Sequence, residues 1–175
     1  MTDTSNTSDA GNRRGIIVDR VSPLVDREFV LFLIGMRINR MLMVPKWWLV
    51  FRAMSRMLTE LSADPEAGLA HFRLQRGLRN FMVVQYWDSW EKLEAYAHDP
   101  GRAHRPAWDE FYRKVGLKGE IGIWHETYLI KPGQVEAVYG NMPPFGLGNV
   151  FELQPSTGAL NNAAARLGAG EREGA

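Results

Sequence analysis

The chain has 175 residues, of which 45% are hydrophobic and 23% charged, a composition typical of one globular domain with a sizeable core. Its 21 basic and 20 acidic side chains nearly balance, so the overall charge gives no reason to expect a nucleic-acid partner. Cysteine is absent, which excludes disulfides, thiol nucleophiles and thiolate metal sites.

The beginning of the chain is polar. Residues 1–15 lack the apolar core of a signal peptide, and no apolar run is long enough to span a membrane. We therefore expect a cytoplasmic protein without a membrane span. Residues 1–20 are expected to form a disordered N-terminal segment.

A strand and a helix come first. Residues 29–39 form a continuous apolar run of strand length, typical of a central strand, and Gly35 inside it indicates a bulge or the close approach of another group. Pro45 then opens a helix, and apolar residues at steps of three and four continue it to Asp64.

A hairpin and a broken helix follow. Residues 69–75 and 81–87 read as two strands joined by a short turn, which predicts an antiparallel hairpin. Asp88 or Ser89 caps the next helix, which breaks at residues 98–101 and restarts near Pro106.

Residues 120–130 form the last predicted strand. Residues 134–150 are apolar but rich in Gly and Pro, and we expect an ordered arm lying over a surface. Residues 151–175 are expected to form a flexible tail.

The order of elements within residues 21–133 is βαββαβ. This order predicts an α+β, ferredoxin-like domain, a four-stranded antiparallel sheet with both helices on one face. The other sheet face needs a cover, and a second copy of the chain is the simplest one. We therefore expect a homodimer in which two sheets close into a dimeric α+β barrel.

Four sequence blocks resemble a known superfamily. They are GMRINR (35–40), YWDSWEKLEAYAHDP (86–100), HRPAW (104–108) and YGNMPPFGLG (139–148). Together they resemble the dimeric α+β barrel proteins, which include antibiotic-biosynthesis and haem-degrading monooxygenases. Within that superfamily they are most similar to a group of proteins named monooxygenase-like after an enzyme of the fumagillin pathway.

The resemblance implies candidate site residues. Haem-degrading relatives use a Trp at the end of the third strand and a helical His, which Trp87 and His104 match, whereas Met36 stands at the position of their first-strand Asn. The cofactor-free oxygenases of the superfamily act on phenolic or enolic substrates with Asn, Trp, Tyr and Arg side chains. This chain offers the following residues for such roles: Arg37, Asn39, Tyr86, Trp87 and Tyr112.

The chemistry of single residues leaves alternatives open. His104 precedes the restarted helix, whose positive end disfavours an imidazolium ion. The residue is therefore either a neutral imidazole that accepts a proton or binds a metal, or a residue that only packs against its neighbours. Trp87 is either core or the wall of a pocket for an aromatic molecule, and Trp108 is a second candidate wall. His98 and His125 are expected to be structural, and the four His show no metal-ligand spacing.

Polar side chains share a face on each predicted strand. If these faces coincide, they form either a hydrogen-bonded dimer interface or a pocket for a polar group. The sets are Arg37 with Asn39; His71, Arg73 and Gln75; Gln85 with Trp87; and His125 with Thr127.

These observations lead to a first hypothesis and two rivals. The first is a monooxygenase-like enzyme that binds a small hydrophobic, aromatic or polyketide-like molecule between the sheet and the helices. His104 would accept a proton, Arg37 and Asn39 would stabilise an oxyanion, and the other side chains would shape the pocket: Trp87, Trp108, Tyr86, Tyr112 and Met36. The rivals are a haem-binding enzyme, of the haem-dependent dehydratase or oxygenase type, in which His104 is the ligand, and a non-catalytic ligand-binding dimer.

Overall fold

The computed structural model describes residues 15–116 and 118–167. It divides into two compact units, one formed by residues 29–129 and the other by the chain on either side. The disorder expected for residues 1–14 and the flexibility expected for residues 168–175 lie outside the described residues.

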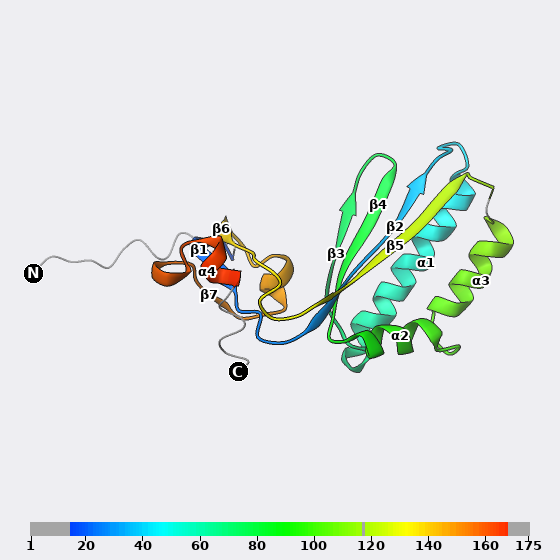
Figure 1. The fold of residues 1–175 in the computed structure, drawn as a ribbon. Coiled ribbons are helices and arrows are strands. Elements are labelled where there is room, and N and C mark those ends of the chain that lie inside the picture. The colour runs from blue at the N-terminus through cyan, green and yellow to red at the C-terminus, as the bar shows by residue number, and fades with distance from the viewer. Residues whose placement is uncertain (1–14, 117, 168–175) are drawn as a thin grey trace, which may run out of the picture. The chain divides into compact units, whose positions relative to one another are not determined.

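The larger unit has the ferredoxin-like fold predicted from the sequence (Figure 1). Its elements are β2 (Phe29–Ile38), α1 (Val44–Ala63), the short turn η2 (Pro65–Ala67), β3 (Leu69–Arg76), β4 (Asn80–Trp87), α2 (Trp90–His98), α3 (His104–Lys114) and β5 (Ile121–Ile130). The strands form one sheet in the order β3-β4-β2-β5. The ladders of β4 with β2 and with β3 are antiparallel.

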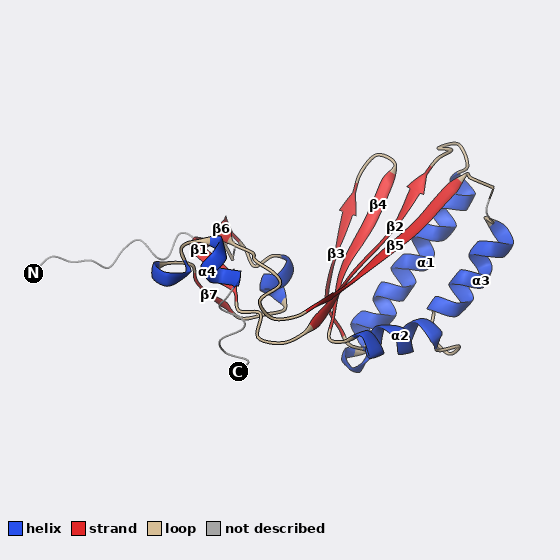
Figure 2. Ribbon diagram, in the orientation of Figure 1, coloured by secondary structure: helices blue, strands red, loops and turns tan. Residues whose placement is uncertain are grey.

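All three helices of this unit lie on one face of the sheet (Figure 2). Alternate residues of the strands pack against them in two buried clusters. One cluster contains Val30, Trp87 and Tyr96, and the other contains Met36 and Phe111. Since side chains alternate along a strand, residues at odd positions of β2 and even positions of β4 and β5 lie on the opposite face, here called the open face.

Local chemistry explains the helix boundaries. Ser89 caps α2, and its hydroxyl accepts a hydrogen bond from the backbone nitrogen of Lys92 at 3.3 Å. The helix that was expected to restart near Pro106 is α3, which begins two residues earlier, at His104. Pro106 is tolerated in the first turn because the first backbone N–H groups of a helix need no intrahelical partner.

The smaller unit contains strands where the sequence predicted disorder, an arm and a flexible tail. Strand β1 (Ile17–Pro23) lies between β6 (Tyr139–Met142) and β7 (Leu153–Pro155), and both pairings are antiparallel. Three short helical segments complete it: η3 (Gly146–Asn149), η4 (Gly158–Leu160) and α4 (Ala163–Leu167). Residues 17–20 and 151–167, which were expected to be disordered or flexible, therefore contain strands and short helices, and residues 134–150, which were expected to form an ordered arm, contribute β6 and η3.

The physical reason is that these strands carry little apolar pattern. In β1 only Val21 and Ser22 are buried, and β7 has three residues. Each strand is held by its partners and not by a periodic apolar face of its own. None of the helices in residues 15–116 and 118–167 combines the length and apolar character needed to cross a bilayer.

Candidate functional site

A cavity of about 670 Å³ lies within the larger unit, between the sheet and helices α1, α2 and α3. Its size falls in the range of small-molecule sites, about 300–1,000 Å³. Most of its lining is apolar and comes from all four strands and all three helices. Representative residues are Phe32, Ile34, Met54, Met57, Leu74 and Phe111.

His104 borders this cavity at the first turn of α3. Its Nδ1 lies 2.9 Å from the carbonyl oxygen of Ala97, in the last turn of α2. A carbonyl oxygen only accepts, so the imidazole donates from Nδ1 and a neutral ring keeps its lone pair on Nε2. The ring stacks at 6.3 Å and 17° on the indole of Trp108, one helical turn later.

Two further imidazoles border the cavity, those of His98 and His125. Nδ1 of His98 lies 3.0 Å from the carbonyl oxygen of Glu94, which fixes the same tautomer as in His104. His125 comes from β5, and its ring lies 5.7 Å from that of Phe32. Both residues were expected to be structural, yet three of the four His in the chain meet at one cavity.

The fourth histidine lies on the open face. The ring of His71 stacks at 6.1 Å on that of Tyr86, its antiparallel neighbour. Partial burial, followed by the charge of Arg73, lowers the pKa of His71. His71 is therefore separated from the cavity by the sheet.

Four of the eight side chains predicted for the site border the cavity: His104, Trp108, Tyr112 and Met36. Trp108 and Tyr112 make an edge-to-face contact at 5.1 Å and are 40% and 45% exposed, so they lie where the cavity meets the surface. Met36 is buried, 5% exposed, and comes from β2. These four residues therefore lie between the sheet and the helices, where the pocket was expected.

The other four lie elsewhere. Arg37 is exposed on the open face and donates a hydrogen bond to Asn80 Oδ1 at 3.2 Å. Asn39 follows β2, and its side chain donates to the carbonyl of Gly119 at 3.1 Å. Tyr86 is buried on the open face, where burial raises the pKa of its hydroxyl.

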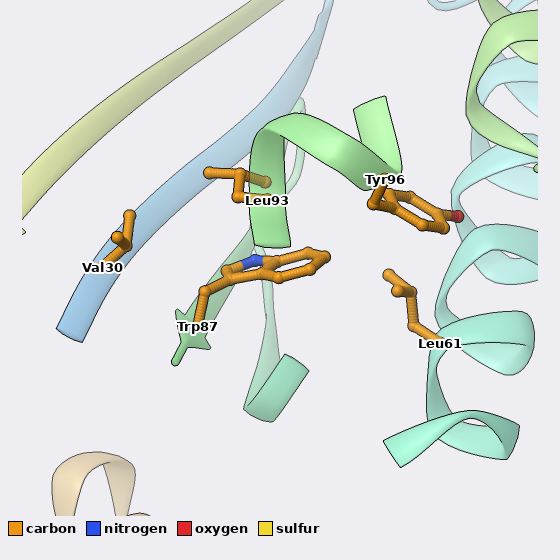
Figure 3. Close-up of a cluster of buried hydrophobic side chains, with 5 residues drawn as sticks. All are labelled: Val30, Leu61, Trp87, Leu93 and Tyr96. Atoms are coloured by element: carbon orange, nitrogen blue, oxygen red, sulfur yellow. The ribbon is translucent and has the colours of Figure 1, made fainter. Parts of the chain in front are cut away.

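Trp87 belongs to the core. It is 1% exposed and packs among Val30, Leu61, Leu93 and Tyr96 (Figure 3). Its indole N–H donates to Gln85 Oε1 at 2.8 Å, which satisfies a buried polar pair. Of its two sequence interpretations, the structure therefore favours core packing.

The predicted polar sets do not share one face. Arg37 and the set of β3 (His71, Arg73 and Gln75) lie on the open face, whereas Gln85, Trp87, His125 and Thr127 face the helices. The strand register therefore places the polar sets on two different faces of the sheet, because side chains at adjacent strand positions point to opposite faces. The polar residues at the cavity that the sequence did not indicate for the site are Glu94, His98 and Ser55, whereas His125 and Thr127 form one of the predicted polar sets.

Haem was one expected cofactor, and it needs an axial ligand for its iron and cationic partners for its two carboxylates. The imidazoles supply an axial donor, but among the described lining residues none is Lys or Arg. The two porphyrin carboxylates would find no cationic partner there, although buried charges require one. The donor set therefore does not fit haem, and no group of three or more metal-ligating side chains occurs in the described part of the chain.

Comparison with known proteins places the chain among oxygenase-like proteins. The family described as "Monooxygenase af470-like" matches residues 29–147. Monooxygenase af470 of Aspergillus fumigatus is 32% identical over 75 residues, which cover 42% of this chain and 26% of that protein. The chain thus spans about a quarter of that relative's length.

One solved structure shares the fold at low sequence identity, and a second is more distantly similar. The aldoxime dehydratase OxdRE, in complex with butyraldoxime, has a TM-score of 0.62 at 15% identity, covering 94% of this chain and 46% of that one. The cofactor-independent oxygenase SnoaB from Streptomyces nogalater has a TM-score of 0.40 at 12% identity, covering 59% of this chain and 94% of that one. Since the family match extends over most of the sequence, this chain belongs to the monooxygenase af470-like family.

Proposed function

We propose that this chain is an oxygenase that binds a hydrophobic, uncharged molecule with an enolic or phenolic hydroxyl in the cavity of the larger unit. One observation carries the proposal: a cavity of about 670 Å³ whose lining is mainly apolar and is bordered by three imidazoles. The apolar lining favours an aromatic or polyketide-like substrate. The imidazoles provide the groups that could take up a proton there.

The chemistry needs only molecular oxygen besides the substrate. In the neutral imidazole of His104, Nδ1 carries the proton and donates to the carbonyl of Ala97, so Nε2 has the lone pair that accepts the hydroxyl proton. The resulting anion is electron-rich and reduces O2 at its activated carbon. One oxygen atom enters that carbon as a carbonyl, the substrate loses two hydrogens, one from its hydroxyl and one from that carbon, and the second oxygen atom leaves as water. The substrate supplies all the electrons, so no external reductant is required.

Arg37 and Asn39 do not border the cavity, so neither is in a position to stabilise an oxyanion formed there. Thr127 of β5 is the better candidate donor, since it borders the cavity on the same strand face as His125.

The test combines binding and turnover. Quenching of tryptophan fluorescence reports binding of a panel of polycyclic phenols, because Trp90 and Trp108 border the cavity. An oxygen electrode and mass spectrometry then report oxygen uptake and a product heavier by the mass of one oxygen atom less two hydrogens. His104→Gln should lower turnover by about 100-fold or more, as removal of a general base does.

His71→Gln is the matched control, because this histidine lies on the open face. Binding without oxygen uptake by any member of the panel would favour a non-catalytic binding protein. A Soret band that appears on adding haem, and is lost in the His104→Gln variant, would favour the haem alternative.

We also propose that the protein is a homodimer in which a second copy covers the open face. This face carries apolar side chains from β2 and exposed aromatic ones from β5, among them Trp124 and Tyr128, which are 37% and 46% exposed. Tyr128→Lys should therefore shift the protein from dimer to monomer in analytical ultracentrifugation. Leu129→Lys changes the next residue, which is 64% exposed, and should leave the dimer intact.

A further inference from the structure

Three loops meet at one end of the larger unit, the end from which α1 starts (Figure 1). Backbone hydrogen bonds hold them together: Ile38 N donates to Arg79 O at 2.8 Å, and Asn39 N donates to Glu120 O at 3.0 Å. This region, here called the loop end, comprises residues 37–48, 76–79 and 118–120.

The tips of the loop end expose large apolar side chains. Leu42 is 94% exposed and Leu78 is 85% exposed. Trp48 and Val44, both 49% exposed, lie on the first turns of α1 behind these tips. Leucines at loop tips contribute nothing to the core, and an exposed apolar group of this kind is typical of an interaction surface.

The same region is strongly cationic. It contains six basic side chains and one carboxylate, that of Glu120, which is buried and paired with Lys46. The five other basic residues are exposed: Arg37, Arg40, Arg76, Arg79 and Lys118. The formal charge of the whole chain is only +1, so positive charge is concentrated at this end.

We propose that the loop end docks on an anionic lipid bilayer. Leu42 and Leu78 would insert among the lipid chains, Trp48 would lie at the boundary with the head groups, and the arginines would contact lipid phosphates. Exposed leucines between arginines suit a bilayer, where apolar burial and charge attraction act together. A nucleic-acid backbone would use the charges but leave the leucines in water.

This proposal concerns binding and does not rest on the proposed oxygenase activity. The two are linked by position, because the cavity begins next to the loop end. Met36, Leu49 and Phe81 border the cavity and belong to the parts of β2, α1 and β4 nearest the loops. A hydrophobic molecule dissolved in the bilayer would therefore have a short path to the cavity.

Sedimentation with vesicles tests the proposal. The full chain should bind vesicles of phosphatidylcholine mixed with phosphatidylserine, bind pure phosphatidylcholine more weakly, and dissociate as salt rises. Leu42→Ser/Leu78→Ser and Arg40→Gln/Arg79→Gln should each weaken binding about tenfold or more. All four residues are exposed, so urea midpoints should match that of the wild type.

The matched control is Leu129→Ser/Arg105→Gln, which removes one exposed leucine and one exposed arginine outside the loop end and should bind as the wild type does. The proposal is overturned if the wild type does not bind the mixed vesicles, or if the loop-end variants bind as the control does. Tight binding to duplex or single-stranded nucleic acid that survives Leu42→Ser/Leu78→Ser, without vesicle binding, would also overturn it.

Discussion

The imidazole of His104 donates its Nδ1 proton to the carbonyl oxygen of Ala97, and 2.9 Å separates the two atoms. The bond joins the first residue of α3 to the last turn of α2 across the break between the helices. The geometry of the helix break therefore determines which tautomer the neutral imidazole adopts. This tautomer leaves Nε2 as the reactive nitrogen of His104.

Nuclear magnetic resonance can test the tautomer. We expect the neutral rings of His104 and His98 to carry their proton on Nδ1, because both Nδ1 atoms face carbonyl oxygens. The more common tautomer in water carries the proton on Nε2. Long-range ¹H–¹⁵N spectra distinguish the two forms, with His71 as the internal reference. An Nε2–H signal for His104 at high pH would contradict the observed bond.

A second prediction concerns Gly35, where the sequence indicated the close approach of another group. A Cβ atom built on Gly35 would lie 2.7 Å from both the Trp124 ring and the Phe81 carbonyl oxygen. Neither contact relaxes easily, so Gly35→Ala should lower the free energy of unfolding by about 1–3 kcal/mol, as overpacking does. Urea denaturation followed by circular dichroism gives this value.

Gly122 of the neighbouring strand is the matched control for Gly35. A Cβ there would lie 3.8 Å or more from its surroundings, an ordinary contact. Gly122→Ala should therefore cost much less than Gly35→Ala. Equal losses for the two variants would show that the contact with Trp124 is not what requires glycine at position 35.

The sequence predicted the ferredoxin-like unit well because each element there carries its own signal. The run at Phe29–Ile38, the helical stripe after Pro45 and the capped helix after Ser89 all appear within one or two residues of the predicted positions. The smaller unit escaped prediction because its strands are short and its buried residues are scattered. Val21 and Phe151 are buried there only because segments far apart in the chain meet.

The site was harder to predict than the fold because it depends on strand faces. Tyr86 and Trp87 are consecutive, so they point to opposite faces and cannot both border one cavity. His98 and His125 were not among the predicted site residues, because a place at a helix C-terminus and a place in mid-strand explained them locally. What unites them with His104 is tertiary structure, which places the end of α2, the start of α3 and the middle of β5 around one space.

A third prediction concerns the hydroxyl of Tyr96. Its oxygen is buried and has no hydrogen-bond partner among the described residues. Burial, and then the nearby charge of Glu60, raises the pKa of Tyr96, so the group stays neutral. Removing an unpaired buried hydroxyl costs little, so Tyr96→Phe should leave the free energy of unfolding unchanged or raise it by up to about 1 kcal/mol.

Urea denaturation again provides the measurement, and Tyr112→Phe is the control because Tyr112 is 45% exposed. A loss of more than about 1 kcal/mol in Tyr96→Phe, with no loss in Tyr112→Phe, would mean that the hydroxyl has a partner such as ordered water.

The last prediction concerns Arg102, which links the helix break to the end of α1. Its guanidinium lies 2.6 Å from Asp64 Oδ2 and 3.6 Å from carboxylate oxygens of Glu60 and Asp99. The hydrogen bond from Arg102 holds the pKa of Asp64 below its ordinary value of 3.8. A carboxylate with a lowered folded-state pKa stabilises the fold above its ordinary pKa, and this stabilisation is lost as pH falls through the lowered value.

Arg102→Gln should therefore lower the free energy of unfolding near pH 7, and its difference from the wild type should shrink as pH falls below 3.8, the ordinary pKa of Asp64, towards its lowered value. Urea denaturation across this pH range, repeated at high salt, measures the effect, and salt should also reduce it. Arg105→Gln removes an exposed arginine of the first turn of α3 and should show a small difference that does not vary with pH. A difference for Arg102→Gln that is the same at neutral and acidic pH would mean that its contact with the Tyr96 ring, at 6.0 Å, matters more than its ion pairs.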